Sequence, residues 1–207
     1  MNQLIPIRNS RRLLAGCVIS IALQCAAAMA QTVSSDLVKA PPVPSNIVPP
    51  AGNQAFLKGN AVGTQNYVCL PSGWTFLGPQ ATLFFTFPWI SGDIRQQITT
   101  HYLSPNPKEG GTPRATWQSS LDTSAVWGKA IASSNDATYV APGAIPWLLV
   151  EIVGAQRGPT GGSILSQTTY IQRVNTSGGV APTTACTVGS VALVPYTTDY
   201  VFYKAVR

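Results

Sequence analysis

Residues 144–186, AIPWLLVEIVGAQRGPTGGSILSQTTYIQRVNTSGGVAPTTAC, form the stretch that decides the fold class. Residues 147–153 are an apolar run of strand length, and residues 164–176 are a longer run rich in β-branched and aromatic residues. A connection rich in Gly and Pro, residues 154–162, separates the two runs. We therefore expect two strands near the centre of a β-sheet, against which the rest of the chain packs.

Short β-rich runs and turn signals alternate through the predicted domain, residues 54–207. No segment shows a sustained helical period. The further predicted strands are residues 62–70, 75–77, 82–87, 97–103, 115–118, 125–132, 191–194 and 199–206. About ten short strands at this spacing predict a single all-β domain, either a β-sandwich or a flattened barrel.

Residues 1–30 have the layout of a cleaved export signal. Basic residues precede an apolar segment at 13–23, and small residues end the stretch. We expect cleavage before Gln31 and a mature protein that is periplasmic or extracellular. The apolar segment is shorter than the roughly 20 residues of a transmembrane helix, so we expect no stable membrane anchor. Sec and twin-arginine export both stay open.

Residues 31–53 contain five prolines, which exclude a helix or a central strand. We expect an extended, partly polyproline-like arm that leads into the domain. Ile47 and Val48, between the prolines, indicate that the arm lies against the core; a disordered tail is the alternative.

Removing the predicted signal takes away Arg8, Arg11 and Arg12 but no acidic residue, which lowers the formal net charge from +6 to +3. The remaining basic residues are scattered singly along the domain. Since a nucleic-acid-binding surface needs clustered Lys and Arg, we expect no nucleic-acid partner.

Cys69 and Cys186 are the two cysteines that remain after the predicted signal. In an exported chain they most simply form one disulfide, with two buried free thiols as the alternative. Closing so long a loop stabilises the fold by roughly 5 kcal/mol as an upper estimate. Two cysteines are too few for a cysteine-only metal site, and we expect no metal and no cofactor.

Several segments together resemble a family of exported proteins known as domain of unknown function 3455. They are residues 41–44 (PPVP), 50–52 (PAG), 63–69 (GTQNYVC), His101, Trp117, 122–128 (DTSAVWG), 144–149 (AIPWLL), 170–179 (YIQRVNTSGG), Cys186 and 194–200 (VPYTTDY). The resemblance covers nearly the whole mature chain and implies export and a single domain. It implies no established activity. Thr123 departs from the family, which has glycine there, so the turn beside Asp122 is expected to differ.

His101 is the only histidine of the chain, which limits the chemistry available. It excludes metal sites built from several histidines, and no Gly-x-Ser-x-Gly motif marks a nucleophile. One histidine can still act as a general acid or base, with Asp122 or Glu151 assisting. A strand histidine bonded to a neighbouring carbonyl or hydroxyl group is the simpler interpretation, and we assign no catalytic residue.

Trp117, placed between His101 and Asp122 among turn residues, is the tryptophan that we expect to be exposed. Planar aromatic rings beside an Asp suit the binding of sugar rings. His101, Trp117 and Asp122 therefore form the predicted binding cluster, and envelope polysaccharide is the first ligand class to test. Asp122 also lies at a turn, where a carboxylate commonly bonds backbone amides.

Glu151 lies within the apolar run at 147–153. If it faces inward it needs a cationic partner, because an unpaired buried carboxylate is costly. Arg173 is the predicted partner in a buried ion pair, and Lys129 is a second candidate. An outward position for Glu151 is the alternative.

Three functions remain open from the sequence. The favoured one is a non-catalytic module that binds an envelope polysaccharide or another ligand outside the cytoplasm. The second is a hydrolase or lyase that uses His101 with Asp122 or Glu151. The third is a structural or assembly protein of the envelope, which requires an exposed apolar patch or strand edge. The oligomeric state stays open.

Overall fold

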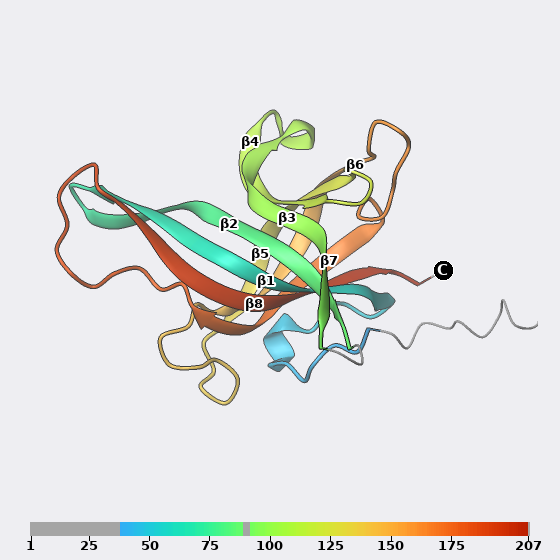
Figure 1. Cartoon of the computed structure of the whole chain (residues 1–207), viewed down its shortest axis with the longest axis horizontal. Helices are drawn as coiled ribbons and strands as arrows, with labels where there is room; N and C mark the ends of the chain where they lie inside the picture. The colour runs from blue at the N-terminus through green and yellow to red at the C-terminus, as the bar shows by residue number, and fades with distance from the viewer. Residues whose placement is uncertain (1–37, 89–91, 207) are drawn as a thin grey trace, which may run out of the picture. The chain divides into compact units, whose positions relative to one another are not determined.

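A computed structural model describes residues 38–88 and 92–206 of the chain. Eight antiparallel strands follow one another in chain order and close into a barrel, with β8 pairing to β1 (Figure 1). They are β1 (Asn53–Leu70), β2 (Gly73–Phe87), β3 (Ile94–Asn106), β4 (Thr112–Ser119), β5 (Ala125–Ser134), β6 (Trp147–Gln156), β7 (Thr168–Gly178) and β8 (Val191–Ala205). The prediction of an all-β domain is confirmed, and of the two architectures the barrel is the one found. The predicted signal, residues 1–30, lies outside the described residues.

Eight strands replace the ten predicted ones because two pairs of predicted strands are continuous. Residues 75–77 and 82–87 belong to β2, and residues 191–194 and 199–206 belong to β8. The gaps between these predicted strands, residues 78–81 and 195–198, include Pro79 and Pro195. Pro79 pairs only with β1, and Pro195 pairs with β1 while its carbonyl accepts from the amide of Gly179 after the end of β7, so neither proline needs to donate to a second strand. A proline at a free strand edge removes no ladder hydrogen bond.

Three strands continue beyond the point where the barrel closes. Pairing of β2 with β3 ends at Ala81 and His101, and pairing of β7 with β8 ends at Gly178 and Tyr196. Past these pairs, β1 lies between β2 and β8 alone, as the long ribbon at the left of Figure 1 shows. We call this part, residues 64–70, 73–80 and 191–195, the three-stranded extension.

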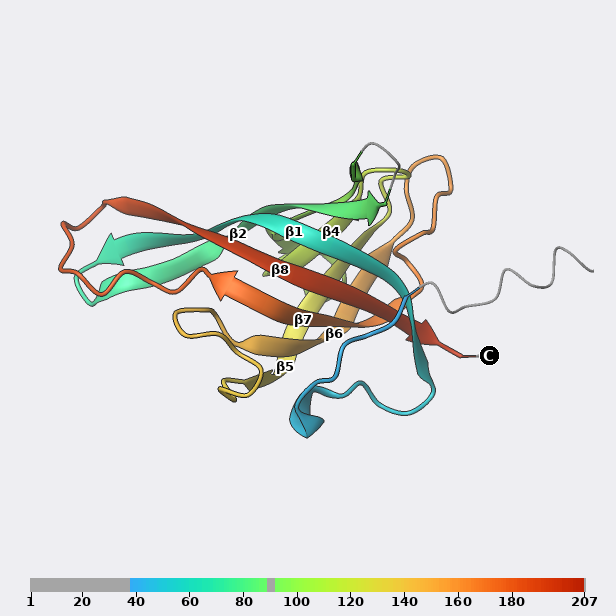
Figure 2. The same ribbon diagram turned by 60° about the horizontal axis from the view of Figure 1, so that its bottom comes forward.

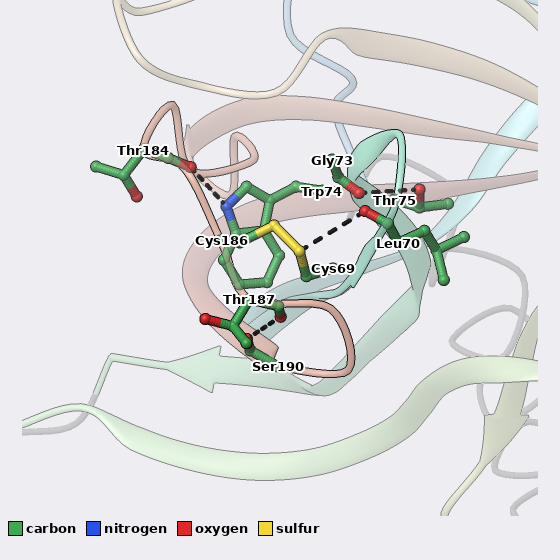
Figure 3. The surroundings of a disulfide bond; sticks show 9 residues. All are labelled: Cys69, Leu70, Gly73, Trp74, Thr75, Thr184, Cys186, Thr187 and Ser190. Atoms are coloured by element: carbon green, nitrogen blue, oxygen red, sulfur yellow. Dashed lines mark hydrogen bonds between the residues drawn. A yellow bond between two sulfur atoms is a disulfide. The ribbon is translucent and has the colours of Figure 1, made fainter.

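Cys69 and Cys186 form the predicted disulfide. It fastens the loop between β7 and β8 to the end of the extension. Trp74 pairs with Cys69 across the strands and lies beside the sulfur atoms (Figure 3). Its Nε1 donates to the carbonyl of Thr184 at 3.1 Å. The amide and carbonyl of Cys69 also bond Ser190 and Gly189 at 2.9 Å each. The loop is therefore held by covalent and hydrogen bonds at the same place.

Buried side chains form two clusters, one on each face of the sheet. The inner cluster fills the barrel and includes Leu83, Trp117, Ile171 and Phe202. The outer cluster lies on the other face of β6, β7 and β8, where Trp147, Leu149, Val174, Val201 and Tyr203 meet the N-terminal arm and the loop before β6.

The described part of the arm, residues 38–52, covers this outer cluster (Figure 2). A short 3-10 helix, η1 (Ser45–Ile47), buries Ile47 completely. The carbonyl of Ile47 accepts a 2.7 Å hydrogen bond from Nε2 of Gln172. Ile47 therefore packs against the barrel as the sequence indicated, whereas Val48 is exposed.

Candidate functional site

His101 and Trp117 lie side by side on the inner wall of the barrel. Register pairs His101 of β3 with Trp117 of β4, so that the two side chains share the inward face. Their rings stack with centroids 4.2 Å apart and planes 12° apart, and the ring of Tyr200 meets both edge-on. Trp117 is 1% exposed and His101 is 4% exposed. The prediction that Trp117 is exposed is therefore wrong, because it belongs to a strand and faces inward.

Gly128 of β5 makes room for this stack. A Cβ atom at this position would lie 2.4 Å from Cγ1 of Val150 and 3.0 Å from Cζ3 of Trp117. Any side chain there would displace the indole from the wall of the barrel. The glycine in the segment at 122–128 thus has a packing role opposite Trp117.

A cavity of about 190 Å³ lies next to the stacked rings. Most of its wall is aromatic or aliphatic. The polar residues of the wall are Gln65, His101, Trp117, Arg173 and Tyr200. All eight strands contribute to it, so the cavity exists only in the closed barrel.

Two buried hydrogen-bond donors on this wall have no partner. Among the described residues, four buried side-chain polar atoms lack a hydrogen bond, and Nε1 of Trp117 and Nε2 of Gln65 are two of them. Gln65 is 3% exposed. Its amide lies close enough to the Tyr196 hydroxyl to lower the pKa of that group, but Nε2 makes no hydrogen bond of good geometry. Both donors belong to residues that line the cavity or its immediate wall.

His101 is neutral in the folded protein. Burial lowers its pKa from 6.5 to about 3, against the smaller opposing effect of its hydrogen bond to Thr116. Nδ1 lies 2.9 Å from the Thr116 carbonyl oxygen, which can only accept, so Nδ1 carries the proton. A group with this pKa is a poor general base near neutral pH, and the geometry gives the hydrolase hypothesis no support.

An open groove of about 760 Å³ adjoins the cavity on the outside. It follows β1, β2 and β3 where the extension leaves the barrel. Pro79, His101 and Leu103 line both the groove and the cavity. Leu103 is 43% exposed and packs over Gly78. A Cβ atom added at Gly78 would lie 3.1 Å from the Cβ of Leu103. Leu103 therefore lies at the border of the groove and the cavity, together with Pro79 and His101.

Asp122 is not part of this arrangement. It lies in the turn between β4 and β5, where Oδ1 accepts from the amide and hydroxyl of Ser124 at 3.1 and 2.7 Å. Oδ2 accepts from the amide of Ile164 at 2.8 Å. Burial raises the pKa of Asp122, but these hydrogen bonds outweigh it and bring the pKa to about 2. The structure thus joins His101 with Trp117 and leaves Asp122 out of the cluster.

The bonds of Asp122 also explain where β7 begins. The predicted strand starts at residue 164, whereas β7 starts at Thr168. The amide of Ile164 is bonded to Asp122, and that of Leu165 to the hydroxyl of Ser124 at 3.0 Å. With these amides taken by side chains, residues 164–167 form a turn.

Thr123, where the sequence departs from the resembled family, has a left-handed backbone with φ of 59°. For a β-branched residue this conformation costs roughly 1 to 2 kcal/mol, and glycine adopts it freely. We expect Thr123→Gly to raise the free energy of unfolding by about 0.5 to 1 kcal/mol, because the relieved strain exceeds the added freedom of the unfolded chain. Urea denaturation measures it.

Thr160→Gly is the matched control, since Thr160 is exposed in a turn and is not among the residues with positive φ. There the substitution relieves no strain, so a loss of stability is expected. If both glycine variants lose stability alike, the turn at Thr123 is not strained.

Glu151 and Arg173 do not form the predicted ion pair. Glu151 pairs in register with Lys129 and Tyr170, and Arg173 pairs with Leu148. Alternation puts Glu151 on the outer face of the sheet and Arg173 on the inner face, so the two side chains cannot meet. Nε and Nη2 of Arg173 instead donate to the carbonyl of Pro146 at 3.2 and 2.8 Å.

Gln65, Leu103 and Tyr200 are residues of the site that sequence reasoning missed, and Arg173 was placed in a different role. Alternation offered one signal: Cys69, Tyr67 and Gln65 occupy every second position of one predicted strand. A buried Cys69 therefore puts Gln65 on the inward face.

In residues 38–88 and 92–206, no group of three or more His, Cys, Asp and Glu side chains is arranged to hold a metal ion. No helix in these ranges has the length and apolar character needed to cross a membrane.

The outer face of the three-stranded extension is apolar and exposed. Leu70, Leu77, Val191 and Leu193 are its exposed large side chains. Beyond the barrel, β2 and β8 also leave one edge unpaired. These are the features that the hypothesis of a structural protein requires.

Neither the curated proteins nor the solved structures with which the chain was compared gave a match. A match was found with the family described as Protein of unknown function (DUF3455), over residues 50–204. These residues include all eight strands except the last residue of β8, both cysteines and the whole wall of the cavity. The resemblance stated from the sequence is confirmed, and the chain belongs to this family of proteins of unknown function.

Proposed function

We propose that this protein binds one small, largely apolar molecule inside its barrel, outside the cytoplasm and without catalysing a reaction. The observation that carries the proposal is the cavity beside the stacked rings of His101 and Trp117, with two buried donors that have no partner. An antiparallel barrel of eight strands has an interior that is either filled by side chains or holds one small ligand.

The unpartnered donors favour a barrel that holds a ligand over one that is filled by side chains. A buried N–H group without a hydrogen bond costs about 1 to 3 kcal/mol, and most buried polar groups are paired. Trp117 and Gln65, which each carry one such group, both line the cavity. A ligand with a hydrogen-bond acceptor would satisfy them, which favours a molecule that is apolar over most of its surface and polar at one end.

The volume limits the size of the ligand. A cavity of about 150 Å³ is enough for benzene. The 190 Å³ found here suits a molecule somewhat larger, of the size of a substituted benzene or a six-carbon chain. A polysaccharide does not fit inside, and Trp117 offers it no exposed ring.

Leu103 is the residue past which a ligand would enter. Its side chain borders both the groove and the cavity and is partly exposed, so a change of its rotamer would widen the connection between them. Exposed side chains change rotamer within nanoseconds. Access then needs no rearrangement of the strands.

Two features support a location outside the cytoplasm. The disulfide between Cys69 and Cys186 forms and persists in oxidising compartments. Residues 1–30 have the layout of an export signal.

Calorimetric titration with four probes tests the proposal: benzoate, benzamide, hexanoate and hexanamide. We expect at least one of them to bind the wild-type protein. Ala130→Leu should weaken that binding at least tenfold, because Ala130 lines the cavity and a larger side chain would occupy it. Ala130 is exposed, so the barrel should tolerate the change.

Ala137→Leu is the control, an exposed alanine in the loop before β6 that does not line the cavity. It should bind as the wild type does. If none of the probes binds, or if both leucine variants bind as the wild type does, the proposal is wrong. Failure to bind together with self-association on a sizing column would favour a structural role for the apolar outer face of the extension.

A further inference from the structure

Arg173 brings a positive charge to the wall of the cavity. It lies on the inner face of β7, opposite Leu148 of β6, and both residues line the cavity. Its guanidinium group is anchored by two hydrogen bonds to the carbonyl of Pro146. Its charge also lowers the pKa values of Tyr67, His101 and Tyr200, although burial has the larger effect on each. Arg173 is therefore close to the other polar groups of the site.

No acidic side chain of the described residues balances this charge. Glu109 bonds Arg114, Asp199 bonds Lys58, and Asp122 bonds the turn amides. Asp136 accepts from the amide of Thr138, Asp93 is exposed in the loop between β2 and β3, and Glu151 faces the outer side of the sheet. Among residues 38–88 and 92–206, these are all the acids.

The other polar groups of the wall are mainly donors. Trp117 can only donate, and the unpartnered nitrogen of Gln65 is a donor. Burial raises the pKa of Tyr200, which keeps its hydroxyl group protonated. The proton of His101 is already used by Thr116. The cavity thus combines one cation and several donors with an apolar wall.

From this arrangement we infer that the ligand is a small apolar acid, bound as an anion, whose carboxylate pairs with Arg173 and accepts from Trp117 and Gln65. The inference rests on the proposed function and adds the chemical class of the ligand. Guanidinium groups bind carboxylates through charge-assisted hydrogen bonds. A buried N–H group also forms a stronger hydrogen bond with a carboxylate than with a neutral acceptor. The apolar body of the acid would lie against the aromatic and aliphatic wall.

Isosteric probe pairs separate charge from shape. Benzoate and benzamide are nearly identical in size, and so are hexanoate and hexanamide. We expect the wild-type protein to bind the acid of at least one pair at least tenfold more tightly than its amide at pH 7. In Arg173→Met the preference should fall to about twofold or less, while binding of the amide is retained.

Arg157→Met is the matched control, because Arg157 is exposed in the loop after β6 and does not line the cavity. It should keep the full preference. Retained amide binding shows that the cavity of Arg173→Met is intact. If that variant does not fold, the ratio of acid to amide affinity of the wild-type protein decides whether the inference holds. Equal binding of acid and amide by the wild type overturns the inference but leaves the proposed function standing. Binding of neither member of either pair overturns the proposed function.

Discussion

Lowering the pH from 7.5 to 4 is expected to cost the wild-type protein roughly 3 kcal/mol of stability through His101 alone. The pKa of His101 is about 3 in the folded protein, compared with 6.5 for an unperturbed histidine in the unfolded chain. Between these values the unfolded chain takes up a proton that the folded protein does not. The contribution of His101 is therefore fully present above pH 6.5 and is lost as the pH falls toward 3.

The cause is burial of the imidazole against Trp117 and Tyr200. A protonated ring would have to leave water and would also face the charge of Arg173. Protonation thus favours release of β3 from the inner wall. The acid transition reports on the same stacked rings that border the cavity.

His101→Phe tests this expectation, since phenylalanine keeps an aromatic ring beside Trp117 and does not titrate. At pH 7.5 the variant should be less stable than the wild type by about 1 kcal/mol, from the lost hydrogen bond to Thr116. Between pH 7.5 and 4 it should lose roughly 3 kcal/mol less than the wild type does. Urea denaturation at both pH values measures the difference.

The comparison stops at pH 4 for a physical reason. Asp122 and Glu109 have pKa values of about 2 in the folded protein, so their stabilisation is lost mainly below pH 4. Both carboxylates are present in the two proteins and cancel in the difference. Parallel pH profiles for His101→Phe and the wild type would show that His101 is not buried as a neutral ring.

Removing the disulfide has the second large expected effect. The bond between Cys69 and Cys186 closes a loop with a sequence separation of 117 residues. In the chain-entropy model a loop of this length stabilises the folded state by roughly 5 kcal/mol, and strain or residual structure lowers the measured value. We expect the double variant Cys69→Ala/Cys186→Ala to lose about 3 to 5 kcal/mol in urea denaturation.

Alanine is the suitable replacement because Cys69 is buried and a serine hydroxyl group would need a partner there. Wild-type protein treated with a reductant should show a similar loss, which separates the missing bond from the missing sulfur atoms. A double variant within about 1 kcal/mol of the wild type would mean that the hydrogen bonds of Trp74 and Ser190 hold the loop without the disulfide.

The fold class followed from local patterns in the sequence. The apolar run at 147–153 and the alternating run at 97–103 are both strands in the structure, each bounded by turn signals. Eight strands take the place of about ten because the predicted gaps at residues 78–81 and 195–198 lie within β2 and β8. Whether Pro79 interrupts a strand depends on whether its edge has a neighbour, and that is a property of the closed sheet.

The candidate site was predictable only in part. The pairing of His101 with Trp117 depends on the register between β3 and β4, which the turn at η2 (Pro107–Glu109) sets and composition does not reveal. The ion pair of Glu151 with Arg173 failed for the same reason, since one step of register decides which face a side chain occupies. Unpartnered donors appear only when every neighbouring side chain is in place.

The central claim is that the barrel holds a small ligand against Trp117, and the indole N–H resonances of the tryptophans test it most directly. Nε1 of Trp74 bonds Thr184 and Nε1 of Trp127 bonds Ser104, whereas Nε1 of Trp117 has no partner. On titration of ¹⁵N-labelled protein with benzoate, we predict a large downfield shift of the Trp117 resonance, with those of Trp74 and Trp127 nearly unchanged. A Trp117 resonance that does not move while benzoate is bound, or shifts confined to the other tryptophans, would contradict the account.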